Sequence, residues 1–174
     1  METTHTGRIH HAMKPLAPPA ASAAASSPLC LKRQLCFALY AASNQVTRLA
    51  RPALEQLGLT YPQYLVMMVL WEHAPCTVGE IGGQLMLDSG TLTPLLKRME
   101  GNRLLTRTRD AADERCVRIA LTTAGRALKR RASKVPELMR CQIALSTPSL
   151  DALREQLQAL IAAVQPAADG NADR

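Results

Sequence analysis

The chain has 174 residues, of which 47% are hydrophobic and only 3% aromatic, a composition typical of one globular domain packed mainly by aliphatic side chains. No apolar run approaches the roughly 20 residues that a membrane helix needs, so we expect no membrane association and a cytoplasmic protein. The five cysteines are widely spaced and include no CxxC pair, which argues against a disulfide framework or a zinc site. We therefore expect no metal and no cofactor.

The net charge of +7 is concentrated in one stretch of the chain. Residues 97–134 contain twelve Lys or Arg against four Asp or Glu. On a single helix such a block would indicate a solvated face, but this stretch covers a predicted helix, a hairpin and a second helix. That spread favours one surface that binds phosphate groups.

The two ends of the chain lack the patterns of folded elements. Residues 1–28 are rich in Ala, Ser and Pro without regular apolar spacing, and three prolines with few large apolar residues argue against a signal peptide. We expect disordered tails at 1–28 and 166–174.

Helical spacing of leucines begins near Pro28 and predicts a long helix over 29–57. Pro52 lies inside this helix and implies a kink or a break there. A second helix is expected to begin near Tyr61, with Pro62 in its first turn, where the missing N–H costs little.

Two short helices separated by a tight turn follow, over about 77–101. Thr77 is the expected N-cap of the first, and Asp88 or Ser89 that of the second. Helix, short turn and helix form the pattern of a helix-turn-helix DNA-binding motif. The predicted apolar face of its second helix consists of Leu92, Leu95, Leu96 and Met99.

The periodicity then changes from helical to alternating. Val117, Ile119 and Leu121 alternate with small or polar residues and predict a β-hairpin over about 104–121, with a charged tip. A hairpin directly after a helix-turn-helix is a wing. The predicted fold is therefore mainly α with a small β-wing, a winged helix-turn-helix domain.

Two more helices, over about 122–165, close the domain. The first is expected to bend at Pro136, and the second to have Thr147 as its N-cap. The last helix carries more apolar side chains than the domain core needs. Together with the helix over 29–57, it predicts dimerisation helices at the two ends of the domain.

This order of elements, over about residues 29–165, resembles the MarR family of bacterial regulators, and within it the organic hydroperoxide resistance regulator (OhrR) group. The strings that carry the resemblance are QLCFALY (34–40), LGLTYPQYLVMMVLWE (57–72), LDSGTLTPLLKRME (87–100) and RDAADERCVRIALTTAGRAL (109–128). The resemblance implies a homodimer that binds a near-palindromic double-stranded operator and represses a peroxide-detoxifying gene. Its effector would be an organic hydroperoxide, and it would not be an enzyme.

The resemblance also implies a thiol sensor. The reactive cysteine of the group falls on Cys36, and a tyrosine that hydrogen-bonds it falls on Tyr61. A second tyrosine of that site falls on Ala50, which has no hydroxyl. In two-cysteine members a resolving cysteine of the partner subunit falls on Cys141, so this chain looks like the disulfide-forming subtype. On its predicted helix Cys141 lies off the apolar face, where a thiol is accessible.

The residues around Cys36 leave its role open, because a lone cysteine can also be a small packed side chain. On a helix that starts at Pro28, Lys32, Arg33 and Tyr40 share the face of Cys36. The two cations would favour a thiolate, the form that reacts. The same helix start would place Cys36 beyond the first turn, where the helix dipole has faded.

The predicted DNA contacts fall on the second helix of the motif and on the hairpin. Short hydroxyl side chains at the helix start permit close approach to base edges and phosphates, although helix capping explains them equally well. At the hairpin, Arg115 resembles the family's minor-groove arginine and Asp113 the acid that orients it. The full predicted set is Ser89, Thr91, Thr93, Lys97, Arg98, Arg109, Asp113 and Arg115.

Three alternatives stay open on the sequence. A MarR-type repressor could release DNA on binding a small phenolic ligand, with Cys36 inert, and Ala50 favours this because a lost tyrosine enlarges the cavity near the thiol. An architectural DNA-binding protein would have no sensor. A thiol peroxidase would be an enzyme, and the winged-helix pattern argues against it.

Overall fold

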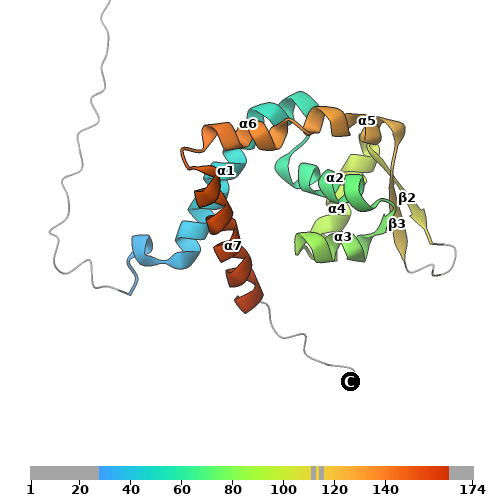
Figure 1. Cartoon of the computed structure of the whole chain (residues 1–174). Coiled ribbons are helices and arrows are strands. Elements are labelled where there is room, and N and C mark those ends of the chain that lie inside the picture. The colour runs from blue at the N-terminus through green and yellow to red at the C-terminus, as the bar shows by residue number, and fades with distance from the viewer. Residues whose placement is uncertain (1–27, 111–112, 114–115, 165–174) are drawn as a thin grey trace, which may run out of the picture. The chain divides into compact units, whose positions relative to one another are not determined.

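The computed structural model describes residues 28–110, 113 and 116–164 (Figure 1). The chain divides into two compact units, one up to Asn44 and one from Gln45 on, and each is described by itself. The first unit contains a 3-10 helix, Leu31–Arg33, and the start of α1 (Leu35–Leu57). Within the described ranges no helix is both long and apolar enough to cross a membrane.

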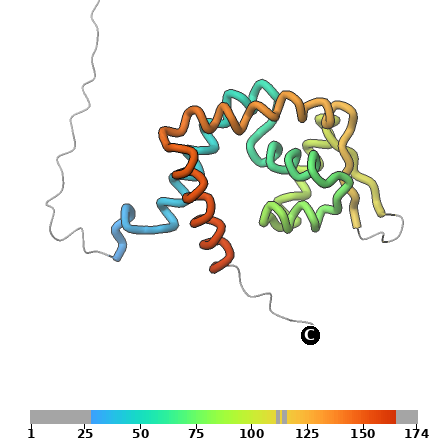
Figure 2. The backbone as a smooth tube through the Cα atoms, in the orientation of Figure 1, coloured from blue at the N-terminus to red at the C-terminus, as the bar shows by residue number. Residues whose placement is uncertain are grey.

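The second unit is a winged helix-turn-helix domain, as predicted. In its described part β1 (Cys76–Thr77), β2 (Leu105–Arg109) and β3 (Val117–Leu121) form one antiparallel sheet in the order β1-β3-β2. Figure 2 traces the chain from α4 through the hairpin and back into α5. Its helices after α1 are α2 (Tyr61–His73), α3 (Val78–Leu85), α4 (Ser89–Gly101), α5 (Thr123–Ala132), α6 (Val135–Gln142) and α7 (Thr147–Val164).

The core of the second unit lies between α2, the helix-turn-helix and the sheet. Leu92, Leu95, Leu96 and Met99 are all buried, which confirms the predicted apolar face of α4. They pack in one cluster with buried side chains of α2, α3 and β3, among them Val66, Met67, Leu70, Ile81 and Ile119. Strand β1 was not predicted; it is two residues long, and its buried Cys76 pairs with Ile119.

Side-chain caps fix where the helices of the motif begin. The Thr77 hydroxyl accepts from the Glu80 N–H at 3.2 Å, and the Glu80 carboxylate accepts from the Thr77 N–H at 2.6 Å. Asp88, and not Ser89, caps α4, where it accepts from the Thr91 N–H at 2.8 Å. Hydrogen bonds from the Thr91 backbone and hydroxyl hold the pKa of Asp88 below its usual value.

The last helix has a different cap from the one predicted. Ser146 Oγ accepts from the Ser149 N–H at 3.3 Å, so Ser146 is the side-chain cap and Thr147 is the first residue of α7. A hydroxyl one residue earlier serves the same purpose, because it still reaches the N–H three residues on.

The predicted start of the first long helix is wrong. Gln34 is extended, with φ −80° and ψ 120°, and separates the 3-10 helix from α1. Its side-chain amide donates to the Pro28 carbonyl at 2.6 Å, which fixes the chain in this turn. The helix therefore begins at Leu35, and it continues through Pro52 without a break.

The predicted fifth helix is two helices, α5 and α6, and the expected bend is a break between Ala132 and Val135. Pro136 has no N–H to donate to the carbonyl four residues earlier, that of Ala132, so a continuous helix would leave this acceptor unpaired. In the observed arrangement Pro136 is the second residue of α6, a position where proline is tolerated.

The hairpin joins α5 at a tight backbone contact. The Leu104 carbonyl accepts from the Thr122 N–H at 3.1 Å, and the Trp71 indole N–H donates to the Gly125 carbonyl at 2.9 Å. A Cβ on Gly125 would lie 2.0 Å from the Leu104 oxygen, far inside van der Waals contact. Only glycine allows α5 to approach the hairpin this closely.

We expect Gly125→Ala to lower the free energy of unfolding by about 2 kcal/mol or more, because backbone must move to admit the methyl group. Gly83→Ala is the matched control: Gly83 is exposed in α3 with nothing within 4 Å, so alanine should stabilise the protein by about 0.5–1 kcal/mol. Urea unfolding of the two variants measures both effects. Equal stability of Gly125→Ala and wild type would contradict the tight contact.

Candidate DNA interface and thiol site

The start of α4 presents the predicted contact residues on its surface. Ser89 and Thr91 are exposed in the first turn, and Thr93 is half-buried. The Thr91 hydroxyl donates to Asp88 Oδ2 at 3.0 Å, so capping and a surface position coincide in this residue. Lys97 and Arg98 are exposed further along the same helix.

The wing carries charged residues on both strands. Arg109 is exposed at the end of β2, opposite Val117 of β3. The Cys116 thiol donates to the Asp113 carboxylate at 3.6 Å, and Arg118 pairs with Asp110 at the base of the tip. Arg115, the predicted minor-groove residue, lies outside the described residues.

Glu100 connects α4 to the wing. Its Oε1 accepts from the backbone N–H of Arg107 at 3.1 Å, and its Oε2 lies 3.8 Å from a guanidinium nitrogen of the same residue. The Nε of Arg107 is buried without a hydrogen-bond partner among the described residues. Sequence reasoning missed this pair, because seven residues and a change from helix to strand separate the two positions.

The basic residues of 97–134 do not form the single surface that we predicted. Three cations of α5 bond to backbone carbonyls: Arg126 to Leu121 at 2.6 Å, Lys129 to Trp71 at 2.9 Å and Arg131 to Gln56 at 2.6 Å. Trp71 and Gln56 lie in the last turns of α2 and α1, where carbonyls lack helical partners and the dipole favours a positive charge.

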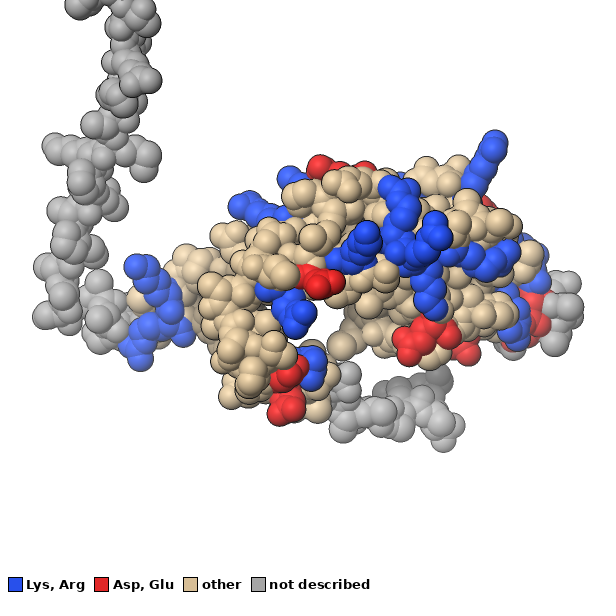
Figure 3. Space-filling view, turned by 45° about the horizontal axis from the view of Figure 1, so that its top comes forward, with Lys and Arg blue, Asp and Glu red and all other residues tan. Residues whose placement is uncertain are grey.

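The two groups of cations also lie on different elements of the second unit. Helix α5 packs on α2 and β3, whereas α4 packs on α2, α3 and β2. Lys and Arg side chains gather on the face of the molecule that carries α5 (Figure 3). The DNA-facing charge therefore reduces to α4 and the wing, and the α5 cations hold helix ends.

The two thiols of the predicted sensor are both exposed. Cys36 is the second residue of α1, and Cys141 lies in the last turn of α6, off the core as predicted. Cys36 belongs to the first unit and Cys141 to the second. Among the described residues no group of three or more His, Cys, Asp or Glu has the geometry of a metal site.

The predicted cationic face around Cys36 is wrong, because Lys32 and Arg33 belong to the 3-10 helix and not to α1. The extended Gln34 between the two helices breaks the helical spacing on which that prediction depended. Tyr40 does share α1 with Cys36, and it is exposed. The helix dipole, which the predicted helix start had excluded, acts on Cys36 in the first turn.

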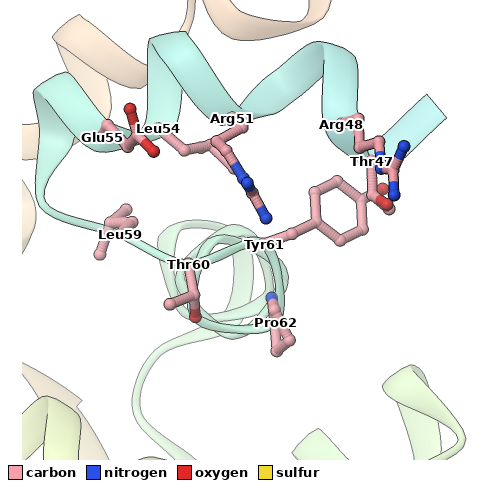
Figure 4. Close-up of a pocket in the computed structure, with 9 residues that line it drawn as sticks. All are labelled: Thr47, Arg48, Arg51, Leu54, Glu55, Leu59, Thr60, Tyr61 and Pro62. Carbon is pink, nitrogen blue, oxygen red and sulfur yellow. The ribbon is translucent and has the colours of Figure 1, made fainter. Parts of the chain in front are cut away.

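Tyr61, the other predicted member of the thiol site, is the first residue of α2 and half-buried. Its ring centroid lies 6.4 Å from that of Tyr64, whose pKa is raised by burial and, second, by Tyr61 itself. Tyr61 lines a pocket between α1 and the start of α2 (Figure 4). Ala50 is fully buried in the core and is not among the residues that line this pocket.

Comparison with known proteins identifies this arrangement. Residues 48–132 match the family described as transcriptional regulator SarA/Rot. The chain is 48% identical over 130 residues to the organic hydroperoxide resistance transcriptional regulator of Bacillus subtilis, a match that covers 75% of this chain and 86% of that protein. It is 46% identical over 133 residues to the HTH-type transcriptional regulator TtmR of Methylorubrum extorquens, covering 76% and 68%.

The chain belongs to the MarR family, in its organic hydroperoxide resistance branch. Among solved MarR-family structures, reduced AbfR bound to DNA is 35% identical, with a TM-score of 0.61 over 75% of this chain and 93% of that one. AbfR has also been solved overoxidised and bound to DNA, and with a disulfide formed. The chain is thus a DNA-binding transcription regulator, as predicted, and not a thiol peroxidase.

We expect Glu100→Ala to weaken operator binding by about 1 kcal/mol, roughly fivefold, because the wing then loses its bond to the end of α4. Glu100→Gln keeps an acceptor for the Arg107 N–H and should retain most of the affinity. Both variants lose the same negative charge, so their difference isolates the hydrogen bond from general electrostatics. Fluorescence anisotropy on a duplex selected from random DNA measures it, and equal affinity of the two variants would exclude this role for Glu100.

Proposed function

We propose that this MarR-family regulator is a homodimeric repressor that senses organic hydroperoxides through Cys36. Oxidation would lead to a disulfide between Cys36 and Cys141 of the partner subunit, and the operator would then be released. The observation that carries the proposal is the position of Cys36, an exposed thiol in the first turn of α1, in a chain 48% identical to an organic hydroperoxide resistance regulator.

The chemistry has two balanced steps. The Cys36 thiolate attacks the distal oxygen of the hydroperoxide, the O–O bond breaks, and the alkoxide takes a proton and leaves as an alcohol. The resulting sulfenic acid condenses with the Cys141 thiol, so that an S–S bond forms and water leaves. The sulfurs must approach to about 2.05 Å, with Cα atoms roughly 4.4–6.8 Å apart.

The environment of Cys36 suits the first step. A reactive cysteine needs thiolate character, and the first turn of a helix favours negative charge through its unpaired N–H groups and its dipole. Tyr61, by resemblance, donates a hydrogen bond to the sulfur, and Tyr40 supplies a second phenol on α1. Lys32 and Arg33 stay in the proposal only as nearby positive charge, without the helix face predicted for them.

The dimer is supported by apolar side chains that the chain leaves uncovered. None of the residues of α7 is buried, although Leu153, Ile161 and Val164 are large and apolar. Leu39 of α1 and Leu138 of α6 are exposed as well. Apolar faces on helices from both ends of the domain fit a self-complementary interface around a two-fold axis.

Operator release follows from the geometry of two half-sites. Each α4 with its wing binds one half-site weakly, and the two must grip together at a fixed spacing. The disulfide couples α1 of one subunit to α6 of the other, so its formation should alter that spacing. AbfR supports a disulfide as the releasing form, because its reduced and overoxidised forms were both solved bound to DNA.

We expect organic hydroperoxide to release DNA from the wild type but not from Cys36→Ser. Cys141→Ser should still be oxidised at Cys36, yet release DNA poorly and proceed to sulfinic acid, because no second thiol captures the sulfenic acid. Cys76→Ser, which changes a buried thiol outside the proposed pair, is the control variant. Mass spectrometry and non-reducing gels of the released protein measure both steps.

Two outcomes would contradict different parts of the proposal. A monomer band from the peroxide-treated wild type would exclude the intersubunit disulfide. Release of DNA from Cys36→Ser by peroxide would exclude Cys36 as the sensor. Release by a phenolic ligand without any oxidation would support the alternative repressor; since Ala50 does not line the pocket beside Tyr61, the structure gives no enlarged cavity in its favour there.

We expect removal of residues 150–174 to abolish both dimerisation and operator binding. Because none of the residues of α7 is buried, the deletion takes no side chain from the core and should leave the winged domain folded. Removal of residues 165–174 alone is the control and should change neither property. Sedimentation and anisotropy measure the two effects; a monomeric deletion variant that still bound operator tightly would overturn the proposed dimer.

A further inference from the structure

The pocket beside Tyr61 has a feature that the proposed function does not use. It has a volume of about 320 Å³, within the range of small-molecule sites. Its apolar wall consists of Leu54, Leu59 and Pro62. Arg48 and Arg51 of α1 also line it, so the pocket combines an apolar wall with two cations.

The two arginines are directed at the start of α2. Figure 4 shows the side chain of Arg51 extending from α1 toward Tyr61 and Thr60, and the ring of Tyr61 extending back toward Arg48. Among the described residues neither guanidinium has an ion-pair or hydrogen-bond partner. Glu55 also lines the pocket, but no ion pair joins it to Arg51, and the lining carries a net positive charge.

The neighbouring helix terminus does not account for this arrangement. The Thr60 N–H donates to the Gln63 side chain at 2.9 Å, and the Gln63 N–H donates to the Thr60 hydroxyl at 3.5 Å. Pro62 has no N–H to offer. The first turn of α2 is thus largely satisfied, and the attraction for an anion comes from the two guanidinium groups.

We propose that this pocket binds the carboxylate of an amphipathic organic acid, and that the regulator thereby prefers hydroperoxides that carry a carboxylate. A guanidinium presents a planar set of donors that matches a carboxylate, and the apolar wall accommodates the hydrocarbon part. This inference rests on the proposed function, since Tyr61 lines the pocket and is also the proposed partner of the Cys36 thiol.

The test compares a medium-chain fatty acid hydroperoxide with its methyl ester, which has the same O–O bond and no charge. In the wild type we expect Cys36 to be oxidised about three- to fivefold faster by the acid, the effect of an exposed ion pair. In the double variant Arg48→Gln, Arg51→Gln this ratio should fall to about one while the rate with the ester is unchanged. High salt should reduce the wild-type ratio in the same way.

Arg130→Gln is the matched control, because it removes an exposed cation of α5 that does not line this pocket. It should keep the wild-type ratio and so separates a specific site from the general attraction of a basic protein. A ratio of one in the wild type, or an unchanged ratio in the double variant, would overturn the inference.

A second measurement keeps the inference independent of the redox proposal. Calorimetry of Cys36→Ser with the corresponding hydroxy acid, which cannot oxidise a thiol, should show binding that the double arginine substitution weakens by a similar factor. Absence of binding to Cys36→Ser would count against the pocket even if Cys36 proved to be the sensor. DNA release by the hydroxy acid alone would identify a non-oxidising acid as the effector, so that the proposed redox function would fail while the site stood.

Discussion

The backbone contact between Leu104 and Gly125 is the constraint on which the arrangement of the DNA-binding parts depends. Leu104 follows the end of α4 and precedes β2, and Gly125 lies in the first turn of α5, so the contact joins both DNA-binding elements to the helices behind them. Thr122 reinforces it by donating its hydroxyl to the Arg103 carbonyl at 2.6 Å. Because Glu100 also bonds to Arg107, α4 and the wing are tied at two places and move as one body.

Charge is divided in this protein according to the acceptor that each cation finds. On α4 and the wing, Lys97, Arg98 and Arg109 are exposed to solvent, where phosphates can reach them. On α5 the nearest acceptors are carbonyls at the ends of α1 and α2, which have no helical partner, and Lys129 and Arg131 bond to them. A positive net charge alone therefore overstates the surface available to DNA.

The sequence predicted the elements whose signal is local. Thr77 and the apolar positions of α4 are set by spacings of three and four residues, and all were found as predicted. Strand β1 is two residues long and exists only because β3 pairs with it, so no local pattern marks it. The bond from Arg131 to Gln56 joins positions 75 residues apart, and the turn at Gln34 depends on its own side chain; neither follows from periodicity. The environment of Cys36 was mispredicted for that reason.

The uncovered α7 has a consequence for how the protein responds to its own concentration. Tertiary packing supplies most of the stability of helices in proteins, and this 18-residue helix buries none of its residues within the chain. In the proposed dimer its helical state is therefore linked to association, and dilution should lower helix content and thermal stability together. At low abundance dimer concentration varies with the square of monomer concentration. Repression would then rise and fall more steeply than the amount of protein, a nonlinearity that precedes any chemistry at the thiol.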